Sequence, residues 1–147
     1  MKAALGSVLV TVTALIAQPA QLDAQGNWRE VVRGQLTRFA ATLTQRGYTA
    51  MAEPVMGNLR DDQNSYHDVA LTSGGRYVIV GACDQDCTDV DLRIYAPSGD
   101  RVAQDIEVDD RPVLEFTASA TGRYRVQVLM ATCNTNPCYW GFQVFAH

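Results

Sequence analysis

The chain has 147 residues, and its 12 Lys and Arg side chains against 16 Asp and Glu leave a formal net charge of −4 at pH 7. Nucleic acids and anionic membrane surfaces attract clustered cations, so an acidic chain without a basic run argues against both as partners. The length suits one domain that can bury a hydrophobic core of its own.

Residues 1–24 have the three parts of a bacterial export signal. Lys2 is followed by an almost uncharged apolar run over 3–17, and Leu22-Asp23-Ala24 places a small residue at a cleavage site. We therefore predict a signal peptide over 1–24 that is cut after Ala24, with a cut after Ala20 as the alternative. The apolar run is shorter than the roughly 20 residues that span a bilayer. This favours release of a soluble protein into the periplasm or the medium over a retained membrane anchor.

Residues 25–63 are predicted to form one amphipathic helix and a connecting segment that pack on the rest of the domain. Asn27 can cap the helix together with Glu30, and Gly47 can end it with a positive φ. Apolar residues recur between them at helical spacing: Trp28, Val31, Val32, Leu36, Phe39, Ala40 and Leu43. This stripe could bind a partner, but most such stripes pack on their own domain.

From residue 64 onward the period of the pattern changes to two. Alternation predicts strands over 66–71, 77–82 and 90–95, and the stretches 112–117, 124–130 and 139–146 complete the series. Residues 75–105 alone predict a strand, an acidic loop closed by a cystine, a second strand, a tight turn and a third strand. Short strands separated by Gly, Pro, Asp and Ser turns indicate an antiparallel β-sandwich. The predicted fold class is therefore mainly β, with one helix before the sandwich.

Two segments of the chain echo each other. DVALTSGGRYVIV at 68–80 and VLEFTASATGRYRVQV at 113–128 each contain a strand, a turn, Gly-Arg-Tyr and a second strand. A loop flanked by cysteines follows each of them. We interpret them as two similar hairpins within one domain, because two copies are too few for a solenoid.

The four cysteines form two close pairs, Cys83 with Cys87 and Cys133 with Cys138. Export favours disulfides, and the CxxC spacing of a zinc site is missing. Local rings would contribute about 2 kcal/mol each and crossed pairs about 4 kcal/mol. Residues 134–137 nevertheless suit a hairpin loop that sets its flanking cysteines opposite each other. Because disulfide geometry tolerates little misalignment, we favour local pairing, with crossed pairing as the alternative.

Four segments together resemble the bacterial pre-peptidase C-terminal domain. They are YVIVG at 77–81, DVDLRIYAPSG at 89–99, VAQD at 102–105 and TGRYRVQV at 121–128. The resemblance covers about 64–145, and it leaves the helix and residues 47–63 outside. It implies a β-sandwich of jelly-roll type over 64–147, in a family usually appended to secreted peptidases.

The first cysteine loop carries a candidate calcium site. Asp84, Asp86, Asp89 and Asp91 place four carboxylates close together, and calcium prefers such hard oxygen ligands. The collagen-binding modules of clostridial collagenases, which belong to the wider family, bind calcium. The loop lacks the spaced glycine and final glutamate of an EF-hand loop, so a solvated acidic turn is the alternative.

The sequence contains no recognisable catalytic motif, and we predict that the protein is not an enzyme. Only His67 and His147 could act as bases near neutral pH. Strand alternation sends His67 and Asp68 to opposite faces, which prevents a triad with Ser65.

Two classes of function therefore fit the sequence. The first is a secreted or periplasmic binding module for a polysaccharide, an extracellular protein or a cell-envelope component. Tyr95 and Tyr139 are its candidate contacts because aromatic faces offer rigid contact area, whereas Trp140 is expected in the core. The second class is a structural or accessory protein that assists an exported enzyme such as a peptidase, or a module stabilised by calcium.

Overall fold

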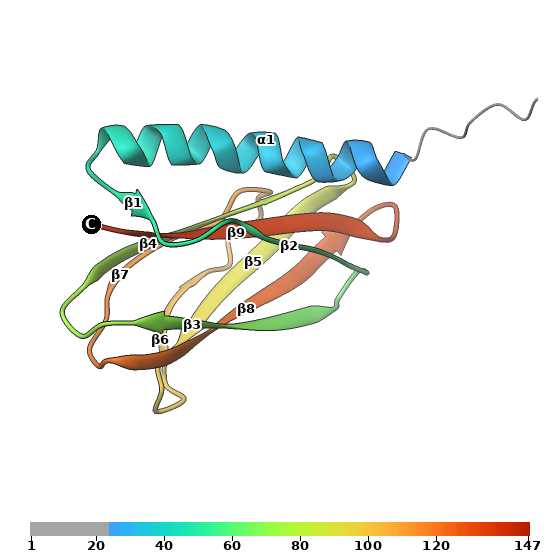
Figure 1. The fold of residues 1–147 in the computed structure, drawn as a ribbon. Helices are drawn as coiled ribbons and strands as arrows, with labels where there is room; N and C mark the ends of the chain where they lie inside the picture. The colour runs from blue at the N-terminus through green and yellow to red at the C-terminus, as the bar shows by residue number, and fades with distance from the viewer. Residues whose placement is uncertain (1–23) are drawn as a thin grey trace, which may run out of the picture.

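A computed structural model describes residues 24–147, so the predicted export signal lies outside the described residues except for Ala24. The elements are α1 Ala24–Gln45, β1 Thr49–Ala50, β2 Val55–Leu59, β3 Asn64–Leu71, β4 Arg76–Cys83, β5 Cys87–Tyr95, β6 Arg101–Asp105, β7 Val113–Thr117, β8 Gly122–Cys133 and β9 Cys138–Ala146. They form two antiparallel sheets and one N-terminal helix (Figure 1). The predicted fold class, a β-sandwich preceded by a helix, is confirmed.

The helix ends where the sequence predicts but begins earlier. Gly47 has a φ of 89°, and the backbone N–H of Tyr48 donates to the carbonyl of Leu43 at 3.0 Å, which closes the last turn. Asn27 lies inside the helix, so its predicted role as the cap is wrong. Ala24 and Gln25 are good helix formers, and they extend the helix beyond the capping signal.

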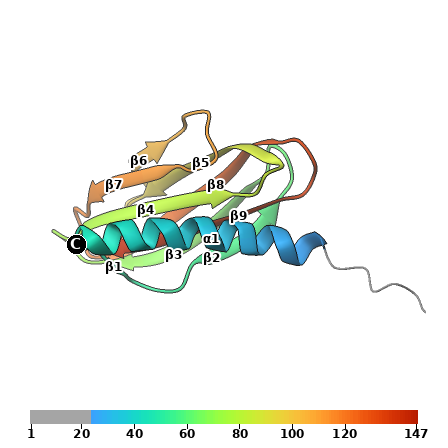
Figure 2. The same cartoon turned by 90° about the horizontal axis from the view of Figure 1, so that it is seen from above.

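The five-stranded sheet has the order β1-β9-β4-β7, with β2 also paired to β9, and α1 lies across its outer face (Figure 2). Val32 and Leu36 are fully buried there and pack in one cluster with Val78, Val80 and Phe145. The four-stranded sheet covers the opposite face, so β4 and β9 are buried on both sides. The apolar stripe of the helix therefore packs on its own domain. In the described part of the chain, no helix has the length and apolar character needed to cross a bilayer.

The four-stranded sheet has the order β3-β8-β5-β6, which places β3 and β4 in different sheets and separates β7 from β8 in the same way. The two echoing segments are therefore arches between the sheets, and the hairpin interpretation is wrong. A turn sequence reverses the chain but does not decide whether the next strand pairs with the previous one.

The arches are nevertheless equivalent in space. If β3, β4 and β5 are matched in order to β7, β8 and β9, the pair β3–β8 corresponds to β7–β4 and the pair β4–β9 corresponds to β8–β5. All four of these pairs are present. The two matching tyrosines have matching contacts. The Tyr77 hydroxyl accepts a hydrogen bond from the Thr72 N–H at 3.0 Å, and the Tyr124 hydroxyl accepts one from the Ala120 N–H at 3.2 Å. This is the bond of a tyrosine corner. The strand pairing of the chain thus has an approximate twofold symmetry.

The connecting segment predicted over 47–63 contains two strands that the sequence analysis missed. β1 and β2 form one interrupted edge beside β9, with Ala50 opposite Phe145 and Val55 opposite Phe142. Pro54 stands in the interruption, where it has no N–H to offer to a sheet. Strands of two and five residues are too short for alternation to reveal them.

The helix should be an integral part of the domain. Leu36→Ala removes a fully buried side chain from the layer between α1 and the sheet, so we expect unfolding to become easier by about 2–5 kcal/mol. Thr44→Ala, at an exposed position of the same helix, is the control and should leave stability nearly unchanged. Chemical denaturation measures both variants, and equal midpoints would show that the sandwich does not need this contact.

Candidate binding site

The outer face of the four-stranded sheet, which points away from the other sheet, is the large uncovered surface of the sandwich. The strand register sets Asp68 of β3 and Tyr95 of β5 on either side of Arg125 of β8. Tyr66 lies opposite Gln127 in the neighbouring row. Alternation along the strands therefore brings acidic, basic and aromatic side chains from three strands to one place.

These side chains surround an open hollow of about 480 Å³, which we call the sheet hollow. Its lining includes Tyr66, Asp68, Tyr95, Pro97, Arg123 and Arg125. Tyr66 leaves 58% of its surface exposed, which is unusual for a large aromatic residue on a folded protein. The hollow therefore offers an aromatic surface beside charged groups.

Two arginines share one carboxylate in the sheet hollow. Arg125 Nε lies 3.2 Å from Asp68 Oδ1, and Arg123 Nη1 lies 3.7 Å from Asp68 Oδ2. All three side chains are exposed, so these ion pairs add little to stability. Each guanidinium has five N–H donors, and a single carboxylate cannot accept hydrogen bonds from all the donors of two guanidinium groups. The hollow therefore keeps a net positive charge and donors for a ligand.

A second set of hydrogen bonds fixes the aromatic wall. The Tyr95 hydroxyl donates to Gln127 Oε1 at 2.8 Å, and Gln127 Nε2 donates to Asn64 Oδ1 at 2.6 Å. This chain of bonds crosses all three strands and restrains the Tyr95 ring before any ligand arrives. The structure therefore places Tyr95, one of the two predicted contacts, half-buried in the lining of the sheet hollow.

Tyr139, the other predicted contact, is not on the surface. It is 6% exposed and packs in the layer beneath α1, because the helix covers the face of β9 on which it lies. The prediction for Tyr139 is wrong. Trp140 points to the opposite side and is buried between the sheets, as expected. The sequence missed Tyr66, Arg123 and Arg125, although their alternation with buried residues could have identified them.

His67 faces the interior, and Asp68 faces the solvent. The ring of His67 lies edge-on to Trp140 and Phe142, with centroids 5.2 and 5.5 Å away, and its Nε2 is 3.1 Å from Ser65 Oγ. Burial lowers the pKa of His67, although the charge of Asp68 opposes this. The imidazole is therefore half-buried against two aromatic side chains of the core, and the fold separates it from the carboxylate that a triad would need.

The disulfides lie at the other end of the sandwich. Cys83 is bonded to Cys87 and Cys133 to Cys138, the local pairing that the sequence analysis favours, with Cα atoms 5.9 and 5.8 Å apart. Each bond joins the end of a strand in one sheet to the start of a strand in the other, so residues 134–137 do not form the predicted hairpin loop. Cys87 and Cys133 are partners in the β5–β8 ladder, which sets the two loops side by side.

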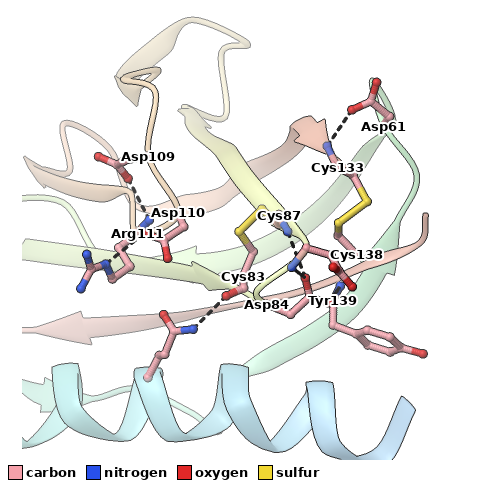
Figure 3. Close-up of a disulfide and its surroundings, with 12 residues drawn as sticks. Asp61, Cys83, Asp84, Cys87, Asp109, Asp110, Arg111, Cys133, Cys138 and Tyr139 are labelled. Atoms are coloured by element: carbon pink, nitrogen blue, oxygen red, sulfur yellow. Dashed lines mark hydrogen bonds and ion pairs between the residues drawn. A yellow bond between two sulfur atoms is a disulfide. The ribbon is translucent and has the colours of Figure 1, made fainter. Parts of the chain in front are cut away.

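Asp84 joins the two cysteine loops from the inside (Figure 3). Its side chain is buried, and Oδ1 accepts the N–H groups of Asp86 and Cys87, each at 3.2 Å. Oδ2 accepts the N–H of Tyr139 at 2.7 Å. Burial raises the pKa of Asp84, and these hydrogen bonds act in the opposite direction. The carboxylate is therefore a structural acceptor with its oxygens turned to the backbone.

The structure does not bring the four predicted calcium ligands together as one set. The Asp84 carboxylate accepts backbone N–H groups, and Asp91 accepts a hydrogen bond from Arg93 at 2.9 Å. Asp86 lies in the turn before β5, whereas Asp89 lies on that strand. Between Ala24 and His147, no group of three or more His, Cys, Asp or Glu side chains is placed to hold a metal ion. The spacing in sequence suggested a cluster, but the chain turns between its members.

Comparison with known proteins identifies a solved structure with a similar fold, but it identifies no family. No family model matches the chain, and no curated protein sequence matches it. Among solved structures, the chain is similar to PliG from Aeromonas hydrophila, which is described as a periplasmic lysozyme inhibitor of g-type lysozyme. The TM-score is 0.52 at 10% identity, over 67% of this chain and 88% of that one. At this identity the likeness concerns the fold. The resemblance to the pre-peptidase C-terminal domain stays a prediction.

Asp84 should be important for stability. Asp84→Ala would remove the side-chain acceptor of three backbone N–H groups, of which that of Cys87 keeps the Asp84 carbonyl as a second acceptor at 3.3 Å. At about 1–3 kcal/mol for each of the two N–H groups left unsatisfied, we expect a loss of at least about 2 kcal/mol. Asp84→Asn keeps one acceptor oxygen and should lose less. Asp86→Ala is the control in the same loop. Equilibrium unfolding ranks the variants, and similar losses in Asp84→Ala and Asp86→Ala would contradict this role.

Asp89 should destabilise the protein at neutral pH. Burial and the charge of Asp91 raise its pKa, so the folded state binds the Asp89 proton more tightly than the unfolded chain does. The stability gained in this way is complete below the ordinary aspartate pKa of about 4 and is lost as the pH rises above it. Asp89→Asn should therefore raise the melting temperature at neutral pH, by an amount that shrinks toward about pH 4. Glu53→Gln, at an exposed position, is the control, and an increase that does not depend on pH would refute the electrostatic cause.

Proposed function

We propose that the protein is an exported, non-catalytic module that binds another protein through the sheet hollow. The side chains that line the sheet hollow are the main support for this proposal. An exposed tyrosine beside two arginines is the combination that dominates protein-binding hot spots. The Tyr95–Gln127–Asn64 bonds support it further, because a restrained surface loses little conformational entropy on binding.

The periplasm or the extracellular medium is the proposed location. All four cysteines are bonded, and structural disulfides persist in oxidising compartments. The export signal predicted over 1–24 supports the same location.

A g-type lysozyme is the first partner to test, because the similar fold of PliG belongs to an inhibitor of that enzyme. An exported peptidase is the second, because residues 64–145 resemble a domain that accompanies secreted peptidases. A polysaccharide is the contrasting ligand, since aromatic residues beside charged groups also suit sugars. The observations favour a protein, because Arg123 and Arg125 supply charge that a neutral glycan cannot use.

Calorimetric titration of the purified protein against these three classes tests the proposal. We expect one protein partner to bind, and the triple variant Tyr66→Ala/Arg123→Ala/Arg125→Ala to weaken that binding at least about tenfold. The control variant Arg29→Ala/Arg46→Ala also removes two arginines, at exposed positions near the two ends of α1, and it should bind the partner normally. Binding that survives the triple variant would contradict the site. Binding to polysaccharide alone would replace the proposed function by a glycan-binding one.

A further inference from the structure

The loop between β6 and β7 presents apolar side chains to the solvent. Val108 leaves 84% of its surface exposed and Ile106 leaves 49%. Val108 has the highest exposure of the large apolar residues that the described chain leaves uncovered. Single exposed apolar residues are common, but here two lie within three residues in one loop.

The backbone of this loop is fixed to the strands beside it. The N–H of Gly81 donates to the Pro112 carbonyl at 2.8 Å, and the N–H of Val90 donates to the Asp109 carbonyl at 3.0 Å. The N–H of Cys83 donates to the Asp110 carbonyl at 3.2 Å. The loop therefore bonds to β4 and β5 next to the Cys83–Cys87 disulfide, and Figure 3 shows residues 109–111 in that setting.

Carboxylates inside the loop fix its shape. Asp105 accepts the N–H of Glu107 at 3.2 Å and the N–H of Val113 at 2.8 Å, so one side chain joins the two ends of the loop. Asp109 Oδ1 accepts the N–H of Arg111 at 2.8 Å. A loop held in this way presents Val108 in a fixed position, and little conformational entropy remains to be lost on binding.

The charge of the loop restricts what it can bind. Residues 105–111 contain Asp105, Glu107, Asp109 and Asp110 against Arg111, so their net charge is −4 + 1 = −3. A second copy of this chain, with a net charge of −4, and an anionic membrane would both be repelled. A positively charged protein surface would be attracted. A partner that accepts both valine and isoleucine also needs an apolar pocket within that basic surface.

We propose that residues 106–111 form a second interaction loop, which inserts Ile106 and Val108 into an apolar pocket on a cationic protein. The loop lies at the disulfide end of the sandwich, whereas the sheet hollow contains Tyr95 at the opposite end of β5. The two surfaces have opposite charge. This inference therefore adds a second contact to the proposed function and does not depend on the sheet hollow.

Site-specific photo-crosslinking in cells that export the full chain tests this inference. A photoreactive amino acid is placed at position 108, at position 66 in the sheet hollow, or at position 44 on the exposed side of α1, and crosslinked proteins are identified by mass spectrometry. We expect position 108 to crosslink to one protein with an excess of Lys and Arg, and position 44 to crosslink to none. Glu107→Gln with Asp110→Asn should lower the yield from position 108 about tenfold, because these carboxylates steer the cationic partner. Glu107 is exposed, whereas Asp110 is half-buried and pairs with Arg111 Nε at 3.1 Å. Both can be changed without removing Asp105 or Asp109, whose carboxylates accept the backbone N–H groups of the loop.

Four outcomes would overturn the inference. They are no crosslink from position 108, a crosslink to a second copy of this chain, a crosslink to an acidic protein, and a yield that the charge variant does not change. Thermal melting of each variant verifies that the fold is intact. Crosslinks from position 108 without any from position 66 would contradict only the proposed role of the sheet hollow, and the reverse result would contradict only the loop.

Discussion

The arrangement of this domain depends on the pairing of β4 with β9 and on the need to cover both faces of that pair. Each strand is apolar on both sides, so the four-stranded sheet buries one side and α1 buries the other. Gly141 allows the helix to come close, since a Cβ there would lie 2.9 Å from Leu36 Cδ1. The same coverage takes Tyr139 away from the surface. It leaves the outer face of the four-stranded sheet as the face with no layer over it.

Covalent and buried polar links gather at the end of the sandwich where β4 passes to β5 and β8 passes to β9. Two disulfides tie the crossings, and Asp84 supplies both loops with a common hydrogen-bond acceptor. Backbone hydrogen bonds to Cys83 and Val90 attach the β6–β7 loop to this end of the sandwich. Burial raises the pKa of Asp84, but three backbone N–H groups replace the water that its carboxylate has lost and offset the cost of burying it. The Cys83–Cys87 disulfide therefore lies beside a loop that it does not contain.

The uncovered sheet face and the β6–β7 loop are two different kinds of surface. The face is polar, with Asp68 between Arg123 and Arg125, and a hydrogen bond to Gln127 restrains Tyr95. The loop is negative, and its tip is apolar. Because they lie at opposite ends of β5, one partner in contact with both would have to extend along the edge of the sandwich. Two smaller partners could also bind at the same time. The approximate twofold symmetry does not extend to these surfaces, since the helix covers only one of the two equivalent sheet faces.

The sequence by itself determined the features that depend on neighbouring residues. Alternation located the strands from β3 onward and separated His67 from Asp68, Gly47 marked the end of the helix, and short loops favoured the local cysteine pairs. The tertiary structure alone decided which strands pair, and this pairing turned the predicted hairpins into arches between sheets. It also decided that Tyr95 lines the sheet hollow, half-buried, and that α1 covers Tyr139. The physical reason is that a period of two assigns side chains to opposite faces of a strand, whereas contacts with distant residues determine which face meets the solvent.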